Sequence, residues 1–161
     1  MFSLMAMATS AFAQVATTAG YDTVYDNGSL STLSLACSDG PNGLYTKGYQ
    51  TLSSLPRFPR VGSIETIPGW NSPNCGKCYK VTYTATGASI NMIGVDAAAS
   101  GIVMSLGALD ELTGGLGEEL GRVNVTYVET AGTDCGDRKR GENWATDACY
   151  PGAMALRWFE W

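Results

Sequence analysis

The 161-residue sequence predicts one compact domain with a turn-rich, mainly β fold. Its length suits a single domain of ordinary size that buries its own core. The chain holds 20 glycines and 16% charged residues, and its hydrophobic residues, 45% of the total, fall mostly in short runs. This combination favours short strands joined by turns over a helical bundle. No apolar run in the sequence is long enough to cross a membrane.

The first stretch, MFSLMAMATSAFA, is apolar and uncharged and ends in Ala-Phe-Ala, the small-residue pattern of a secretory cleavage site. It predicts a signal peptide over residues 1–13, shortened at its front because the usual basic residues are missing. A misassigned start and a buried helix are the alternatives. The mature, secreted chain is then expected to begin near Gln14.

The first half of the chain predicts one strand and two loops. Residues 20–27 (GYDTVYDN) are expected to form a strand that ends in an Asp-Asn-Gly turn, with Asp22 and Asp26 on one face. Residues 37–44 (CSDGPNGL) concentrate the residue types of a tight loop. Residues 55–62 (LPRFPRVG) contain two prolines and are expected to be extended or turning.

The second half predicts strands around one helix. Residues 78–86 (CYKVTYTAT) and 89–96 (SINMIGVD) indicate a hairpin or two consecutive strands. Residues 101–115 (GIVMSLGALDELTGG) repeat apolar side chains at helical spacing and end in paired glycines, which predicts an amphipathic helix. Residues 122–130 (RVNVTYVET) alternate apolar and polar side chains and predict a final strand.

Five cysteines provide the clearest constraint on the fold. Cys75 and Cys78 are separated by two residues, a spacing shared by redox sites, zinc sites and neighbouring disulfide ends. A redox motif normally opens a helix, whereas Cys78 leads into a predicted strand. A zinc site would need Cys37 and Cys135 without a second close pair. Two long-range disulfides are favoured, each worth up to about 4 kcal/mol, and Cys149 is then left over.

The sequence has no histidine and a formal net charge of −5. The missing histidine removes the commonest general base, the Ser-His-Asp and Cys-His systems and most catalytic zinc sites. Acid-base chemistry would therefore depend on carboxylates. The negative charge disfavours binding to phosphate backbones, so nucleic acid is not an expected partner, whereas a neutral polysaccharide meets no such objection. No metal or cofactor is expected.

Two N-glycosylation sequons occur, at Asn27-Gly-Ser and Asn124-Val-Thr. They permit a glycan without requiring one. Asn124 lies in the middle of a predicted strand and is the poorer acceptor. Both are expected to stay unmodified.

Several short motifs, taken together and in order, resemble the cerato-platanin family of small secreted fungal proteins. The resemblance covers about residues 21–136, and the number of ordered motifs makes it specific. The motifs are YDTVYDNGS, CSDGPNGLYTKGY, LPRFPRVG, GWNSPNCGKC, VDAA, ALDELTGG and LGRVNVTY.

The resemblance implies a single-domain, six-stranded double-psi β-barrel over residues 14–136, mainly β with short helices. It also implies two disulfides that join Cys37 to Cys75 and Cys78 to Cys135. Related folds occur in expansins and in other wall-active proteins.

The sugar-binding groove of the family is shallow, polar and open, and the matched motifs place it on ten residues. Aromatic rings can stack on the apolar faces of sugars, and the polar groups can bind hydroxyl and acetamide groups. Asp96 is the leading single candidate, because it matches an acidic residue linked to expansin-like activity; a structural carboxylate that bonds loop amides is the alternative. The ten residues are Tyr21, Asp22, Tyr25, Asp39, Gly40, Asn42, Gly43, Trp70, Asn71 and Asp96.

The resemblance implies a non-enzymatic protein of the fungal cell wall and its surroundings. Family members bind chitin and N-acetylglucosamine oligomers, loosen cellulosic material and act as elicitors or phytotoxins in plants. A plant receptor and self-association are further expected partners. The alternatives are a weak wall hydrolase and an interfacial structural protein of the wall. Hydrolysis would need a second carboxylate beside Asp96, and Asp22, Asp26 and Asp39 are the candidates.

The sequence departs from the family pattern in three places, one of which is Gly115-Leu116-Gly117 in place of Gly-Gln-Ala. Ala97 and residues 101–103 (GIV) replace a polar residue and a Gly-Phe-Asn stretch, which alters the expected groove edge. The family chain normally ends soon after the last barrel cysteine, whereas residues 137–161 continue here with Cys149 and three late aromatics. This tail is interpreted as a disordered segment or a gene-model artefact, with an interaction segment as the alternative.

Overall fold

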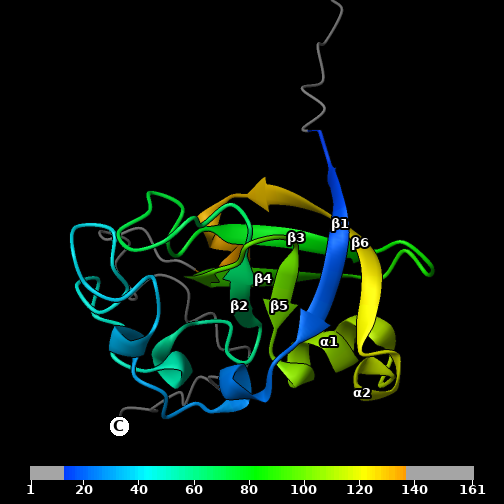
Figure 1. The fold of residues 1–161 in the computed structure, drawn as a ribbon, viewed down its shortest axis with the longest axis horizontal. Helices are drawn as coiled ribbons and strands as arrows, with labels where there is room; N and C mark the ends of the chain where they lie inside the picture. Colours follow the sequence, from blue (N-terminus) through cyan, green and yellow to red (C-terminus); the bar gives the residue numbers. More distant parts are fainter. Residues whose placement is uncertain (1–12, 137–161) are drawn as a thin grey trace, which may run out of the picture.

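Six strands close into a barrel in the computed structural model, which describes residues 13–136 (Figure 1). The order around the barrel is β1-β5-β2-β4-β3-β6. The six-stranded barrel implied by the motifs is therefore confirmed. The strands are β1 (Val15–Tyr21), β2 (Val61–Ile64), β3 (Cys78–Tyr83), β4 (Ser89–Ala97), β5 (Ile102–Met104) and β6 (Arg122–Thr130).

The barrel mixes parallel and antiparallel pairing. β1 pairs with β5 and β2 pairs with β4 in parallel, while the other neighbouring strands are antiparallel. The predicted hairpin is present, because β3 and β4 are antiparallel neighbours. Closure gives every strand two hydrogen-bonded neighbours and removes the free sheet edge that would otherwise invite further pairing.

Short helices fill the connections. Helices α1 (Leu106–Thr113) and α2 (Gly117–Leu120) lie together at one end of the barrel, and the long connections between β1 and β3 gather at its side (Figure 1). None of the helices in residues 13–136 is long and apolar enough to cross a membrane. The 3-10 helices are η1 (Thr23–Asp26), η2 (Thr32–Ser34), η3 (Leu52–Ser54) and η4 (Gly132–Cys135).

The barrel interior is filled by apolar side chains. β6 shows why the sequence pattern works: Val123, Val125 and Tyr127 are buried, while the residues between them face outward or are half-buried. The helix α1 covers the core with Leu109 and Leu112. Fully buried large side chains also include Tyr79, Leu44, Leu52, Ile64, Ile67, Met92, Ile102 and Met104.

Two disulfides connect the chain across the fold. Cys37 bonds to Cys75 and Cys78 bonds to Cys135, so the pairing implied by the resemblance is confirmed. The first bridge joins two loops that precede β3, and the second joins the first residue of β3 to η4. The predictions for residues 1–12 and 137–161, including Cys149, lie outside the described residues.

The predicted strand over residues 20–27 is wrong. β1 ends at Tyr21, and the following residues form the 3-10 helix η1. Asp22 causes the change, because its side chain accepts a hydrogen bond from the amide of Val24 and caps the helix. Asp22 and Asp26 therefore do not share a strand face. β1 itself and β2 were not recognised as strands.

The predicted helix over residues 101–115 is correct only in its second part. Ile102–Met104 form the short strand β5, which pairs with β1 and β2. The helix α1 begins after Ser105, whose side chain accepts a hydrogen bond from the amide of Ala108. It ends at Gly114, in the left-handed conformation expected of a glycine cap.

Candidate functional site

An exposed indole dominates the loops joined by the first disulfide. Trp70 is 64% exposed, yet its ring is not free, because Nε1 donates a hydrogen bond of 2.7 Å to Oδ1 of Asp39. This bond lowers the pKa of Asp39, which also accepts a bond from the Ser38 hydroxyl. The carboxylate thus stays charged and holds the aromatic face toward solvent. We call the two loops, residues 37–44 and 69–75, the Trp70 surface.

Two glycines allow close approaches in the Trp70 surface, Gly40 between the two loops and Gly43 within the first loop. Gly40 has φ +82°, and a Cβ there would lie 2.9 Å from Oδ1 of Asn71 and 3.1 Å from the Trp70 ring. A Cβ at Gly43 would lie 2.2 Å from the carbonyl oxygen of Asp39. These distances leave no room for a larger residue at either position. The glycines shape the Trp70 surface without contributing polar side-chain groups.

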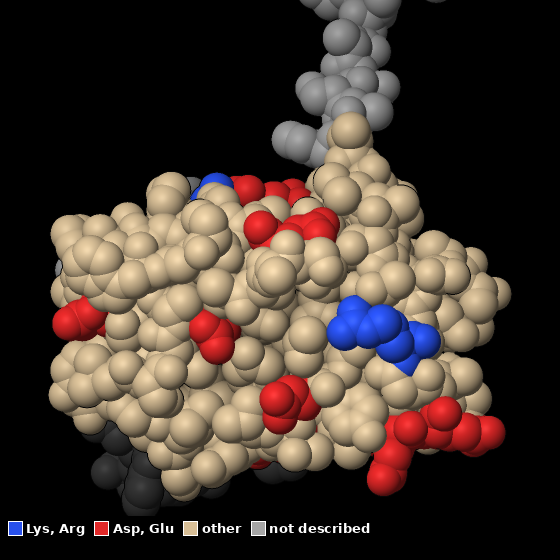
Figure 2. All heavy atoms as spheres, viewed as in Figure 1, with Lys and Arg blue, Asp and Glu red and all other residues tan. Residues whose placement is uncertain are grey.

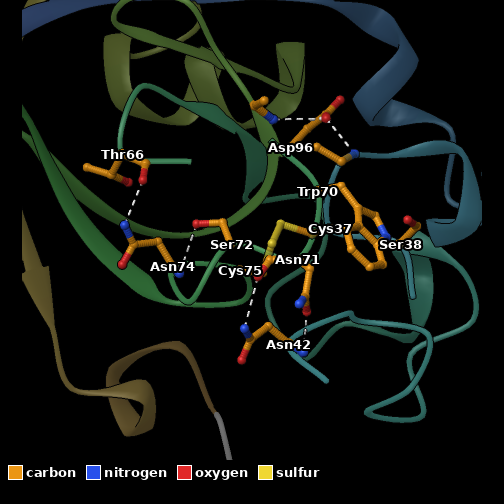
Figure 3. The surroundings of a disulfide bond; sticks show 12 residues. Cys37, Ser38, Asn42, Thr66, Trp70, Asn71, Ser72, Asn74, Cys75 and Asp96 are labelled. Atoms are coloured by element: carbon orange, nitrogen blue, oxygen red, sulfur yellow. Dashed lines mark hydrogen bonds between the residues drawn. A yellow bond between two sulfur atoms is a disulfide. The ribbon is translucent and has the colours of Figure 1, made fainter. Parts of the chain in front are cut away.

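Asn42 holds the two loops together by donating two hydrogen bonds to Asn71. Asn71 adopts the left-handed conformation, with φ 57°, which asparagine tolerates better than most residues. Its Oδ1 accepts from the amide of Asn42 at 3.0 Å, and its carbonyl accepts from Nδ2 of Asn42 at 2.9 Å (Figure 3).

Each of these asparagines keeps one polar side-chain atom unused. Nδ2 of Asn71 and Oδ1 of Asn42 make no hydrogen bond within residues 13–136, and neither atom is shut off from solvent. A donor and an acceptor are therefore available to a ligand beside the Trp70 ring.

Further hydrogen bonds fix polar groups in the Trp70 surface and next to it. Nδ2 of Asn74 donates to the carbonyl of Thr66 at 2.6 Å, and Nζ of Lys47 donates to the carbonyl of Cys75 at 3.1 Å. Asn74 and Lys47 were missed in the sequence analysis. Asn74 could have been found, because asparagine in a turn commonly bonds nearby backbone; the contact of Lys47 with a distant carbonyl leaves no sequence signal.

Asp96 lies near the end of β4 and accepts three hydrogen bonds. Its Oδ1 accepts from the amides of Ala36 at 2.8 Å and Ala97 at 2.9 Å, and its Oδ2 accepts from the hydroxyl of Tyr25 at 3.0 Å. Tyr25 is only 6% exposed, and this burial, together with the carboxylate, raises the pKa of its hydroxyl. Asp96 thus bonds a loop and a 3-10 helix that are distant in sequence.

The other predicted acids serve as helix caps. Oδ1 of Asp22 accepts from the amide of Val24, and the two oxygens of Asp26 accept from the amides of Leu106 and Gly107 at the start of α1. Both carboxylates therefore satisfy backbone donors that a helix start leaves open.

Nine of the ten predicted residues fall into two groups on either side of the first disulfide. Figure 3 shows Trp70, Asn71 and Asn42 close to Cys37 and Cys75, with Asp96 beyond the bridge. The two groups are connected through the backbone, because the amide of Cys37 bonds to the carbonyl of Val95. The first group is Asp39, Gly40, Asn42, Gly43, Trp70 and Asn71; the second is Asp22, Tyr25 and Asp96.

Tyr21 stands apart from both groups, and a further aromatic was missed. Tyr21 is half-buried at the end of β1 and packs against the core. Tyr45 is 40% exposed, and its amide bonds to the carbonyl of Ser38, which places it next to the Trp70 surface. It belongs to the motif that carries Asp39 and could have been selected as an exposed loop aromatic. No cluster of three or more potential metal ligands occurs in residues 13–136.

Comparisons with known proteins agree with this architecture. The family model described as Cerato-platanin matches residues 17–137. A "Heat-stable 19 kDa antigen" of Coccidioides immitis is 50% identical over 116 residues, which is 72% of this chain and 78% of the antigen.

Solved structures match at the level of both fold and sequence. A crystal structure of cerato-platanin 3 from M. perniciosa has a TM-score of 0.72 and 45% identity, covering 75% of this chain and 98% of that one. The solution structure of "the fungal elicitor Cerato-Platanin" has a TM-score of 0.66 and 43% identity, covering 73% and 95%. The chain, with its closed barrel and two disulfides, belongs to the cerato-platanin family.

Proposed function

We propose that this protein is a secreted fungal protein that binds neutral polysaccharide chains, with chitin and N-acetylglucosamine oligomers as the first candidates. The observation that carries the proposal is the solvent-facing ring of Trp70, held by Asp39 beside an unused donor and acceptor on Asn71 and Asn42. Binding without catalysis is the proposed activity. Loosening of cellulosic walls would follow if the same surface separates neighbouring chains.

The chemistry of the surface suits a sugar. A pyranose ring has an apolar face that can stack on an indole, and its hydroxyl and acetamide groups need donors and acceptors at the edge. The ring of Trp70 is already fixed, so binding costs little side-chain entropy there. The molecular face in Figure 2 is mostly uncharged, with scattered acidic groups and fewer basic ones, which is compatible with a neutral ligand and unfavourable for a polyanion.

Asp96 has a supporting role in this proposal. Its two oxygens already accept three hydrogen bonds, so its carboxylate holds the backbone of Ala36 and the ring of Tyr25 in place. The loop that begins at Ala36 continues directly into Cys37 and Asp39. Asp96 thereby affects the Trp70 surface by holding in place the loop that leads into it.

The same geometry argues for binding over hydrolysis. A glycosidase generally needs one carboxyl group kept protonated, with its partner roughly 5 to 10 Å away across the scissile bond. The bond from Trp70 lowers the pKa of Asp39, which makes it a poor proton donor. Asp22 and Asp26 are engaged as helix caps. Release of new reducing ends from chitin or glucan, lost in Asp96→Asn, would favour the hydrolase alternative.

A titration of the purified full chain with N-acetylglucosamine oligomers tests the proposal. We expect the largest NMR shifts at the Trp70 indole and at the side-chain amides of Asn71 and Asn42. Trp70→Ala should weaken binding by roughly tenfold, equivalent to about 1.4 kcal/mol. Leu116→Ala is the matched control, because Leu116 is also exposed but lies beside α2. Shifts that are absent, or that map away from the Trp70 surface, would reject the proposal.

A pair of substitutions at Asp96 tests its supporting role. Asp96→Asn keeps an oxygen for the amides of Ala36 and Ala97, so binding should stay close to that of the natural protein. Asp96→Ala leaves those amides without their partner and should cost about 1–3 kcal/mol of folding free energy as well as weakening binding. Equal loss of binding in both variants, with the fold intact, would instead indicate direct contact between the charge and the sugar.

The wider biological role is proposed from the relatives. The names "antigen" and "fungal elicitor" belong to proteins that other organisms detect, which supports a secreted protein with elicitor activity in plants and a receptor on the host side. Residence in the fungal cell wall would follow from chitin binding. Wall fractionation of the producing fungus, followed by release of the protein with chitin oligomers, would test this location.

A further inference from the structure

The chain contains two Asn-Gly pairs, Asn27-Gly28 and Asn42-Gly43, in different environments. In such a pair the glycine nitrogen can attack the asparagine side chain, because glycine has no Cβ to block the approach. Asparagine is for this reason among the thermolabile residues of proteins. Whether the reaction proceeds depends on how firmly the fold holds the attacking nitrogen and the amide that it attacks.

In the first pair, few hydrogen bonds hold the attacking nitrogen and the side-chain amide. Asn27 is exposed at the end of η1, and the backbone nitrogen of Gly28 makes no hydrogen bond within residues 13–136. The side-chain oxygen of Asn27 accepts one bond of 3.1 Å from the amide of Ser29, which draws electron density away from Cγ. Its nitrogen Nδ2 has no partner in the described part of the chain.

In the second pair, hydrogen bonds hold both the attacking nitrogen and the side-chain amide. The backbone nitrogen of Gly43 donates to the carbonyl of Gly40 at 3.0 Å, and Nδ2 of Asn42 donates to the carbonyl of Asn71 at 2.9 Å. Gly43 is buried, with no space for even a Cβ beside Asp39. Ring closure there would require the Trp70 surface to open.

We propose that Asn27 is a site of spontaneous deamidation and that the fold protects Asn42 from the same reaction. The nitrogen of Gly28 gives its proton to hydroxide from the solvent and bonds to Cγ of Asn27, while the π electrons of the Asn27 side-chain carbonyl move to Oδ1. The bond from Cγ to Nδ2 then breaks, and Nδ2 leaves as ammonia after gaining a proton. Water opens the resulting five-membered imide at either carbonyl and yields aspartate or isoaspartate. No oxidant, reductant or cofactor is consumed.

The rotation needed for ring closure differs in cost between the two pairs. At Asn27 it disturbs the side-chain bond from the amide of Ser29 and two backbone bonds, from the amide of Leu30 to the Asn27 carbonyl and from the amide of Ser53 to the Gly28 carbonyl. At Asn42 it disturbs the contacts that join both loops across the Cys37–Cys75 bridge. The structure therefore separates two chemically identical pairs by their surroundings.

The product would change the chain next to the second group of site residues. An acid at Asn27 adds a negative charge beside Asp26, which caps α1, and close to Tyr25, which bonds to Asp96. It also abolishes the sequon at this position, so glycosylation and deamidation exclude each other. Isoaspartate would in addition lengthen the backbone between η1 and the bridge formed by Ser31 and Thr51.

The test follows both asparagines in one sample. The disulfide-intact full chain, produced in a host that does not add glycans, is incubated at mildly alkaline pH and mapped by peptide mass spectrometry over time. A second sample is reduced and unfolded. In the native chain, Asn27 should convert at least roughly tenfold faster than Asn42, which corresponds to about 1.4 kcal/mol of local protection. In the unfolded chain the two rates should be similar.

Two results would overturn the proposal. One is equal conversion of both asparagines in the native chain, and the other is a native Asn27 that stays intact while the unfolded one reacts. Asn27→Gln is the control, because the longer side chain disfavours the five-membered ring, and this variant should lose the acidic species seen on ageing. An ageing pattern that persists in Asn27→Gln would also count against the site.

Discussion

The barrel and the Trp70 surface are stabilised in different ways. The barrel relies on strand pairing and buried apolar side chains, and each of its strands has two neighbours. The Trp70 surface has little regular structure and relies on side-chain hydrogen bonds to backbone, left-handed residues and one disulfide. Because different interactions hold the two regions, we expect the barrel to stay folded when the candidate site changes shape. Substitutions should therefore be able to separate stability from binding.

The largest expected effects come from removing the disulfides. Each pair of Cys→Ala substitutions should lower the free energy of unfolding by up to about 4 kcal/mol through the unfolded state, measurable by denaturant unfolding. Cys78→Ala with Cys135→Ala should leave the Trp70 indole resonance close to its native position. Cys37→Ala with Cys75→Ala should also shift that resonance. An unchanged indole signal in the second variant would show that the loops hold without their bridge.

A smaller effect is expected from one methyl group in the Trp70 surface. Gly40→Ala forces a left-handed alanine and crowds Asn71 and Trp70, which should cost about 1–3 kcal/mol and weaken sugar binding. Gly48→Ala is the matched control. Gly48 also has a positive φ but has open space at its Cβ position, so this variant should lose stability and keep binding. Equal binding in both variants would contradict the proposed shape requirement.

The smallest expected effect is a pH dependence confined to the Trp70 surface. The pKa of Asp39 is lowered in the folded protein, chiefly by the bond from the Trp70 indole. The contribution of this bond is therefore present above the ordinary aspartate pKa and is lost as the pH falls through the lowered value. The indole resonance of Trp70 should shift in that acid range, while the barrel signals stay in place. Asp39→Asn should remove the shift, since the amide does not titrate there.

Strands rich in β-branched and aromatic residues could be predicted from the sequence. β3, β4 and β6 were found because they carry β-branched and aromatic side chains over six to nine residues. β1 was missed because VATTAGY has small residues and no clear alternation. β5 was missed because its three residues continue the apolar spacing of α1, and only pairing with β1 and β2 decides their conformation.

The candidate site could be predicted in its residues but not in its contacts. The motifs selected Trp70 and Asp39, yet nothing in the sequence shows that the carboxylate of one would hold the ring of the other across 31 residues. The partners of Asp96 were hidden for a different reason. Two of its three donors are backbone amides, which every residue except proline possesses, so Ala36 carries no sequence signal.

The order of the two disulfides has a consequence for proteolysis. They close two covalent rings in tandem, residues 37–75 and 78–135, joined only through Gly76 and Lys77. A single cut inside either ring leaves the pieces tethered, whereas a cut at the junction would divide the molecule in two. Lys77 would attract a trypsin-like protease, but the junction is pinned to β4 by paired bonds between Gly76, Lys77 and Gly94. The segment whose cleavage would separate the two rings is thus held against β4 by hydrogen bonds.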